Sequence, residues 1–160
     1  MEVILKEKQK FNQLFIWIPL LLLLIFAIKN FYEEMSISNL IPLLIMGIVI
    51  LFLVFITLAY SIDKEGVSIS FFPFFRRKIF RKEEIGEINI VDYSPISDFG
   101  GWGLRYGRNN TTAYNVKGNR GILFLLKDGK NYLIGSQLDE SYLQEKLNIF
   151  FDNKVNIKKY

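Results

Sequence analysis

The chain has 160 residues, a formal net charge of +4 and a hydrophobic fraction of 51%. It contains no cysteine, which excludes disulfide bonds and thiol chemistry. It also contains no histidine, so the commonest metal ligand and the commonest general base are both missing. The composition therefore argues against a metal site and against most forms of acid–base catalysis.

Two long apolar runs occupy the N-terminal part of the chain. Neither the run from Phe11 to Ile28 nor the run from Met35 to Ile62 contains an Asp, Glu, Lys or Arg. A helix needs about 20 mostly apolar residues to cross the hydrocarbon core of a bilayer. We therefore expect two transmembrane helices, at about residues 11–29 and 37–60, within an N-terminal region of residues 1–62.

Two other interpretations of these runs are weaker. A cleaved signal peptide is disfavoured because no small-residue cleavage site follows the first run and a second apolar run comes at once. Two helices buried in a soluble core are disfavoured because polar residues at a helical period are missing from both runs. The sequence therefore indicates a protein that has the lipid bilayer as a partner.

The positive charges around the apolar runs predict their orientation. The short connection from Lys29 to Glu34 has one lysine against two glutamates, whereas both flanking segments are richer in Lys and Arg. Since cytoplasmic segments carry the excess of Lys and Arg, we expect a multi-pass protein of the inner (cytoplasmic) membrane with both termini in the cytoplasm. A connection this short forces an antiparallel hairpin of helices.

Residues 63–152 have the size of a single domain, and residues 153–160 are expected to form a C-terminal tail. Gly66 marks the first turn of this domain, where a positive φ suits glycine, and Asp128-Gly129 marks a hairpin near its end. Between such turn signals, β-like runs predict strands at residues 60–63, 67–72, 74–81, 86–93, 111–116, 121–127 and 131–135.

One amphipathic helix closes the domain. Ser136 is expected to cap its N-terminus, with Asp139 three residues later. Its apolar stripe consists of Tyr142, Leu143, Leu147, Phe150 and Phe151. About seven antiparallel strands must close or stack to protect their edges, and a helix can cover one open end. The predicted architecture is a transmembrane α-helical hairpin followed by a mostly-β barrel of antiparallel strands, capped by a C-terminal helix.

Three segments of the domain carry a resemblance to a known family. They are Gly100 to Gly103 with Arg105, Ala113-Tyr114-Asn115-Val116 with Gly118 and Gly121, and Ile134-Gly135-Ser136 before the helix. With the two apolar helices, they resemble bacterial PH-like membrane proteins, in which a helical hairpin carries one cytoplasmic PH-like domain. The resemblance covers about Leu14 to Phe151 and implies a PH-like barrel. It implies little about activity, because the family has no assigned one.

A basic cluster follows the second apolar run. It comprises Arg76, Arg77, Lys78, Arg81 and Lys82, with no acid among them. In one interpretation, these cations face anionic lipid at the cytoplasmic leaflet, where each contributes about 1 kcal/mol of binding free energy. In the other, they protect the solvated edge of a strand from pairing with another chain. Nucleic acid is not an expected partner, because the domain is tethered to a bilayer and is only mildly basic.

The glycine-rich loop around Trp102 is the second candidate binding site. Arg105-Tyr106 and a turn follow these glycines, in place of the helix N-terminus that a phosphate-binding loop needs. The sequence therefore favours Trp102 as a packing residue in a tight turn. In a functional alternative, Trp102, Arg105 and Arg108 dock an anionic lipid or a peptide.

The predicted function is non-enzymatic. No serine or carboxylate pair has the context of a catalytic site, and neither a cofactor nor a metal is expected. We expect a membrane-anchored binding or scaffolding module that contacts an unidentified protein partner, or a second copy of itself, at the cytoplasmic face. The alternative is a reader of anionic lipid headgroups that uses the basic cluster and the Trp102 loop.

Overall fold

The computed structural model describes residues 3–151 and 155–160. The chain divides into two compact units. One is a helical hairpin between residues 10 and 56, and the other combines the N-terminal strand with everything from Thr57 onward.

The hairpin consists of α1 (Leu14–Glu33) and α2 (Ile37–Phe55). Both helices are long and apolar enough to cross a membrane, judged by length and composition. Ala27 is the one buried residue of α1, and α2 has none among its described residues. The connection is closed by Asn39, whose side-chain amide donates hydrogen bonds to the backbone oxygens of Asn30 (3.3 Å) and Glu34 (3.0 Å).

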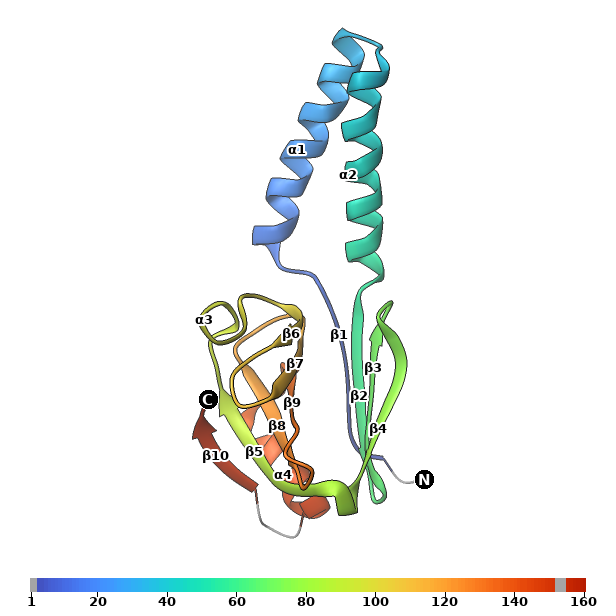
Figure 1. Cartoon of the computed structure of the whole chain (residues 1–160). Helices are drawn as coiled ribbons and strands as arrows, with labels where there is room; N and C mark the ends of the chain where they lie inside the picture. The colour runs from blue at the N-terminus through green and yellow to red at the C-terminus, as the bar shows by residue number, and fades with distance from the viewer. Residues whose placement is uncertain (1–2, 152–154) are drawn as a thin grey trace. The chain divides into compact units, whose positions relative to one another are not determined.

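The other unit contains two sheets (Figure 1). The first has the strand order β1-β2-β3-β4 and is built from β1 (Val3–Lys10), β2 (Thr57–Asp63), β3 (Gly66–Phe72) and β4 (Phe75–Arg81). The second has the order β10-β5-β8-β9-β7-β6 and is built from β5 (Ile85–Asp92), β6 (Gly103–Tyr106), β7 (Thr111–Asn115), β8 (Arg120–Leu126), β9 (Asn131–Ser136) and β10 (Val155–Lys159). Three helical segments complete the unit: η1 (Lys82–Glu84), α3 (Pro95–Phe99) and α4 (Glu140–Phe151).

The first sheet joins strands from both sides of the helical hairpin. β1 precedes α1, β2 follows α2, and the two strands are neighbours in the sheet (Figure 1). The second helix was expected to continue to residue 60, but it ends at Phe55 and β2 begins at Thr57. The helix ends here because the spacing of the buried residues changes to that of a strand. Leu58, Tyr60 and Ile62 are buried at every second position, as in a strand with one face on a core.

The predicted closed barrel is not observed among the described residues. The strands form two separate sheets, and they are not all antiparallel, because β7 pairs with β9 and β10 pairs with β5 in parallel. β10 lies in the segment expected to be a tail, whereas the predicted domain boundary at residues 152 and 153 lies outside the described residues. The turn between β2 and β3 and the β8–β9 hairpin lie where the sequence predicted them.

Aromatic rings fill the space between the two sheets. Phe80 of β4 stacks on Tyr132 of β9 with ring centroids 4.5 Å apart. Phe71 and Phe75 make edge contacts with Tyr114 of β7, at centroid distances of 6.2 and 5.3 Å. Such edge and offset-stacked ring pairs add about 0.5–1.5 kcal/mol each beyond burial of their area. The β3–β4 hairpin is therefore fixed against the second sheet along its inner face.

A carboxylate on β1 joins the two sheets a second time. One oxygen of Glu7 accepts hydrogen bonds from the Tyr60 hydroxyl (2.8 Å) and the Ser136 hydroxyl (2.7 Å), and the other accepts from the Gln137 backbone N–H (2.8 Å). Gln9 donates to the backbone oxygen of Gly135 at 2.7 Å. Burial and the neighbouring Glu7 charge raise the pKa of the Tyr60 phenol, which therefore stays protonated and donates.

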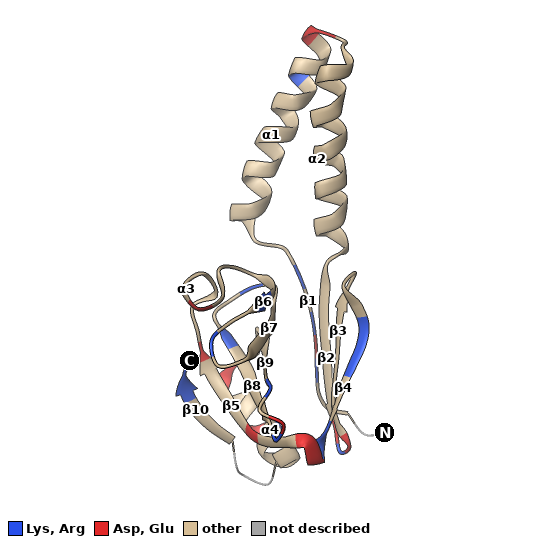
Figure 2. Ribbon diagram, viewed as in Figure 1, with Lys and Arg blue, Asp and Glu red and all other residues tan. Residues whose placement is uncertain are grey.

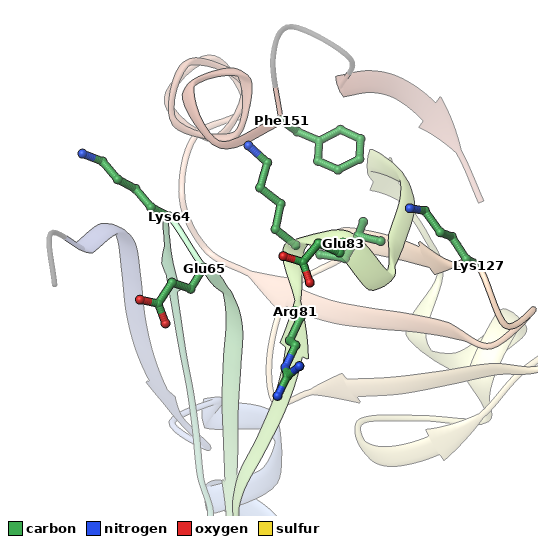
Figure 3. Close-up of a pocket in the computed structure, with 8 residues that line it drawn as sticks. Lys64, Glu65, Arg81, Glu83, Lys127 and Phe151 are labelled. Carbon is green, nitrogen blue, oxygen red and sulfur yellow. The ribbon is translucent and has the colours of Figure 1, made fainter.

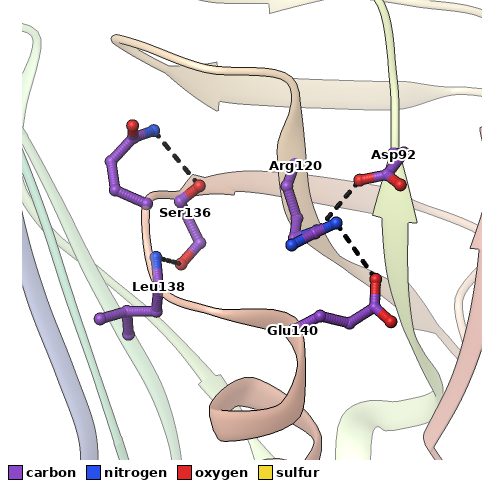
Figure 4. A network of polar contacts seen from close by, with 6 residues as sticks. Asp92, Arg120, Ser136, Leu138 and Glu140 are labelled. Atoms are coloured by element: carbon purple, nitrogen blue, oxygen red, sulfur yellow. Dashed lines mark hydrogen bonds and ion pairs between the residues drawn. The ribbon is translucent and has the colours of Figure 1, made fainter.

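Helix α4 packs on the second sheet through the predicted stripe. Leu143, Leu147 and Phe150 are fully buried, whereas Tyr142 is exposed. Ser136 does not cap the helix as predicted. It ends β9 four residues earlier, and its hydroxyl accepts from the Leu138 backbone N–H at 3.2 Å. Arg120 of β8 holds the first turn of α4, because its guanidinium bridges Asp92 (3.0 Å) and Glu140 (3.2 Å), as Figure 4 shows.

Gly66 has a different role from the one predicted. It is not among the residues with positive φ. A Cβ at this position would lie 2.1 Å from the backbone oxygen of Phe80. The glycine is therefore required for the close approach of β3 to β4, at the end of the sheet where the β2–β3 turn lies.

The burial of Leu147 predicts a large loss of stability for Leu147→Ala. Truncating a fully buried leucine costs about 2–5 kcal/mol, through lost apolar contacts and the cavity left behind. Chemical unfolding of the full chain in a nonionic detergent, followed by tertiary fluorescence, measures this change. Ile149→Ala is the matched control, because Ile149 is on the same helix and is exposed; its effect should stay below about 0.5 kcal/mol. Equal effects of the two substitutions would contradict the docking of α4.

The Glu7 contacts predict that Glu7→Gln destabilises the unit by about 1.5–3 kcal/mol, the range for hydrogen bonds to charged groups. A glutamine replaces one accepting oxygen with an N–H donor, so it cannot accept from all three partners. Hydrogen exchange of the β1 and β9 amides should rise in this variant. Lys8→Gln, an exposed neighbour on the opposite face of β1, should leave exchange unchanged. Unchanged exchange in Glu7→Gln would show that β1 is held by other contacts.

Candidate functional site

The predicted basic cluster lies on β4 and η1, at one edge of the first sheet (Figure 2). The structure does not keep the five cations together. Arg76 and Arg81 are five residues apart on an extended strand, a separation of about 16 Å. The cluster therefore has three parts: Arg76 and Arg77 near the β3–β4 turn, Lys78 between the sheets, and Arg81 and Lys82 at the opposite end.

Lys78 is a structural residue between the sheets. Its ammonium lies 3.9 Å from the ring centroid of Tyr132 and donates a hydrogen bond to the Tyr114 hydroxyl at 3.3 Å. Burial opposes the charged form, but the interactions with Tyr132 and Tyr114 outweigh it and raise the pKa of Lys78. Burial also raises the pKa of Tyr114. The ammonium therefore stays charged, and its contacts with the aromatic rings add to the packing between the sheets.

Arg81 and Lys82 line a cavity of about 720 Å³. Lys64 and Glu65 reach it from the β2–β3 turn, and Lys127 from the turn after β8 (Figure 3). Further lining residues are Glu83 and Ile85, and Phe151 at the end of α4. The cavity is open to solvent, and its lining combines charged side chains with the apolar ones of Ile85 and Phe151, as expected of a site for part of a larger molecule.

Backbone hydrogen bonds fix the segments that surround this cavity. The Lys82 N–H donates to the Glu65 oxygen at 2.8 Å, and the Lys127 N–H donates to the Glu84 oxygen at 2.9 Å. The Glu84 carboxylate accepts from the Arg81 N–H at 2.9 Å. Lys82 also lies over the ring of Phe150, 5.5 Å from its centroid. The cavity therefore has a preformed frame that does not need a ligand to order it.

The charges around the cavity favour an anionic ligand. Four cations line it, against the two carboxylates of Glu65 and Glu83. Within the described residues, no group of three or more potential ligand side chains is placed to hold a metal ion. The cavity can therefore hold carboxylate or phosphate groups by charge and hydrogen bonding, while Ile85 and Phe151 contact an apolar neighbour of such a group.

The Trp102 loop is ordered by contacts within its own sheet. Trp102 is half-buried, and its indole N–H donates to the Gly118 backbone oxygen at 3.4 Å. The Gly103 N–H donates to the side chain of Asn115, which is fully buried. Arg105 is exposed and donates to the Trp102 backbone oxygen at 3.0 Å. These contacts favour the packing role for Trp102, and the docking role stays a prediction.

The predicted site residues therefore belong to separate places. The Trp102 loop, with Arg105 and the exposed Arg108, is on the second sheet, and the basic strand is on the first. Sequence reasoning missed Lys64, Lys127 and Phe151 as partners of Arg81 and Lys82. They are far apart in the chain, and only the folding of α4 and the β8–β9 hairpin against η1 places them around one cavity.

No protein-family model matches the sequence, and no curated protein matches it. Among solved structures, the chain is similar to one described as the structure of the Spt16D Pob3N heterodimer, with a TM-score of 0.43 and 10% sequence identity. The alignment covers 66% of this chain and 47% of that chain, so this chain spans about half the length of the solved one. No functional residue is transferred at that similarity.

Proposed function

We propose that the chain is a membrane-anchored, non-enzymatic binding module of PH-like fold. On this proposal, α1 and α2 cross the inner membrane, the β-rich unit lies in the cytoplasm, and the cavity lined by Arg81, Lys82, Lys64 and Lys127 binds an acidic segment of a protein partner. The observation that carries the binding role is one preformed cavity that is lined by four cations and by the apolar side chains of Ile85 and Phe151.

The pairing of β1 with β2 supports the membrane topology. These strands precede and follow the helical hairpin, so a chain that crosses the bilayer in α1 must cross back in α2 to form the first sheet. The charges support a cytoplasmic location. β1 carries Lys6, Lys8 and Lys10, whereas Lys29, in the last two turns of α1, forms an ion pair with Glu33 at 3.5 Å.

The separation of the cations along β4 favours a protein segment over lipid. Arg76 and Arg77 lie near one end of this strand, whereas Arg81 and Lys82 lie at its other end and line the cavity. Headgroup binding by the whole basic cluster would need all five cations on one surface, and two of the five belong to the cavity.

Cysteine labelling tests the topology, because the chain has no native cysteine. In intact bacterial cells, Ser36→Cys in the helix connection should react with an impermeant maleimide. Ser97→Cys, a matched substitution at an exposed position of α3, should react only after the membrane is permeabilised. The reverse pattern would contradict the cytoplasmic placement, and equal labelling of both positions in intact cells would contradict the membrane-crossing hairpin.

Binding of an acidic peptide tests the cavity. The full chain in a nonionic detergent should bind a fluorescein-labelled peptide of Glu and Phe residues, measured by anisotropy, and should not bind a Gln and Phe peptide. Arg81→Gln and Lys127→Gln should each weaken binding by about twofold to fivefold, as expected for about 0.5–1 kcal/mol per partly solvated charge.

The matched control for these variants is Lys117→Gln, which removes an exposed cation outside the cavity and should leave the affinity unchanged. Equal weakening by all three substitutions would show attraction to net charge alone and would contradict a specific site. If Arg81→Gln instead dissociates a dimer of the full chain, the acidic partner is a second copy of this chain.

A further inference from the structure

The turn between β3 and β4 exposes aromatic side chains at the edge of the first sheet. Phe72 is 41% exposed and Phe74 is 48% exposed, on either side of Pro73. Arg76 and Arg77 follow within the next three residues, and both are exposed. We call the segment from Phe72 to Arg77 the aromatic tip. Exposed phenylalanines next to arginines are the composition that proteins place at the level of lipid headgroups.

Ring contacts at both of its ends hold the aromatic tip. Phe71 is fully buried and its ring lies 5.0 Å from that of Phe74, measured between centroids. Phe75 is fixed by its edge contact with Tyr114 at 5.3 Å. Arg77 donates a hydrogen bond to the Ser68 hydroxyl at 3.3 Å on the outer face of the sheet. The exposed rings are thus presented by an ordered hairpin, which lowers the entropy cost of placing them in an interface.

Strand register fixes which end of the sheet carries the aromatic tip. Phe72 pairs directly with Thr57, so their Cα atoms are about 5 Å apart. Thr57 is the second residue after Phe55, the last residue of α2. At the opposite end of the same strands, Ile62 pairs with Val67 beside the cationic cavity. The aromatic tip is therefore at the end of the sheet from which the chain continues into an apolar helix.

We propose that the aromatic tip inserts into the headgroup region of the bilayer that α2 enters, with Phe72 and Phe74 among the upper acyl carbons and Arg76 against lipid phosphates. This inference rests on the proposed membrane anchoring and concerns a surface separate from the cationic cavity. Both the charge and the shape of the aromatic tip suit the lipid headgroup region. An anionic leaflet attracts the two arginines, and two phenylalanines on a narrow turn can enter an interface without displacing much lipid.

Depth-dependent fluorescence quenching tests the insertion in the full chain. Single-cysteine variants at three positions are labelled with the environment-sensitive dye NBD and reconstituted into vesicles of phosphatidylcholine and phosphatidylglycerol. Phe74→Cys reports the aromatic tip, Glu65→Cys the opposite end of the sheet, and Leu44→Cys the apolar part of α2. Nitroxide groups are introduced on lipids at the headgroup, at the upper acyl chain or at the chain centre.

The expected pattern separates the tip from the anchor. The fluorescence emission of the Phe74 probe should shift to shorter wavelength and be quenched by headgroup and upper-chain nitroxides. The fluorescence of the Glu65 probe should remain unquenched. The Leu44 probe should be quenched by chain-centre nitroxides. Adding Arg76→Gln to Phe74→Cys should reduce the quenching in vesicles that contain phosphatidylglycerol, and the same addition should have a smaller effect in vesicles of phosphatidylcholine alone.

Two outcomes would overturn the inference. If the Leu44 probe is quenched and the Phe74 probe is not, the helices are anchored but the tip does not touch the bilayer. If the unlabelled Phe74→Cys variant forms a disulfide-linked dimer on oxidation, and the labelled variant is not quenched by lipid nitroxides, the tip contacts a second copy of this chain. An unquenched Leu44 probe would instead contradict the membrane anchor of the proposed function, and with it the insertion of the tip.

Discussion

The structure depends on β1, an edge strand of the first sheet whose side chains also contact the second sheet. This strand precedes the helical hairpin in sequence, pairs with β2 that follows it, and uses Glu7 to hold Tyr60 and the end of β9. The carboxylate is well suited to this position, because three donors converge on it and it accepts from each. The helical hairpin is therefore inserted in the chain between two neighbouring strands of one sheet, and both of its ends connect to the same β-rich unit.

The polar character of β1 explains why the sequence did not reveal it. The positions that face the core are Leu5, Glu7 and Gln9, and only the first is apolar. Glu7 and Gln9 are directed inward because β9 offers them backbone and hydroxyl partners, a condition set by tertiary structure. The outward lysines of the same strand were assigned to membrane orientation. Lysines on an edge strand also prevent its pairing with other chains, so the same residues fit both the membrane orientation and a strand at the edge of a sheet.

The parts predicted correctly have local causes. The β8–β9 hairpin follows from Asp128-Gly129, and the buried stripe of α4 follows from helical spacing of Leu143 and Leu147. The sheet arrangement has no such local cause. Parallel pairing of β7 with β9, and of β5 with the terminal β10, depends on contacts between segments far apart in the chain. For the same reason, the cavity could be anticipated only through Arg81 and Lys82, and not through Lys127 or Phe151.

The register irregularity in β4 gives one basic strand three different environments. Ile69 pairs with Lys78 but Phe71 pairs with Phe75, so an extra residue is accommodated between them. Without that bulge, Phe75 and Lys78 would point to opposite faces; with it, both face the second sheet and contact Tyr114. The bulge leaves the arginines at the turn in solvent, while Arg81 continues to the cavity at the other end. The two ends of this strand therefore differ in chemistry: exposed arginines follow exposed phenylalanines at one end, and Arg81 lines a cavity at the other.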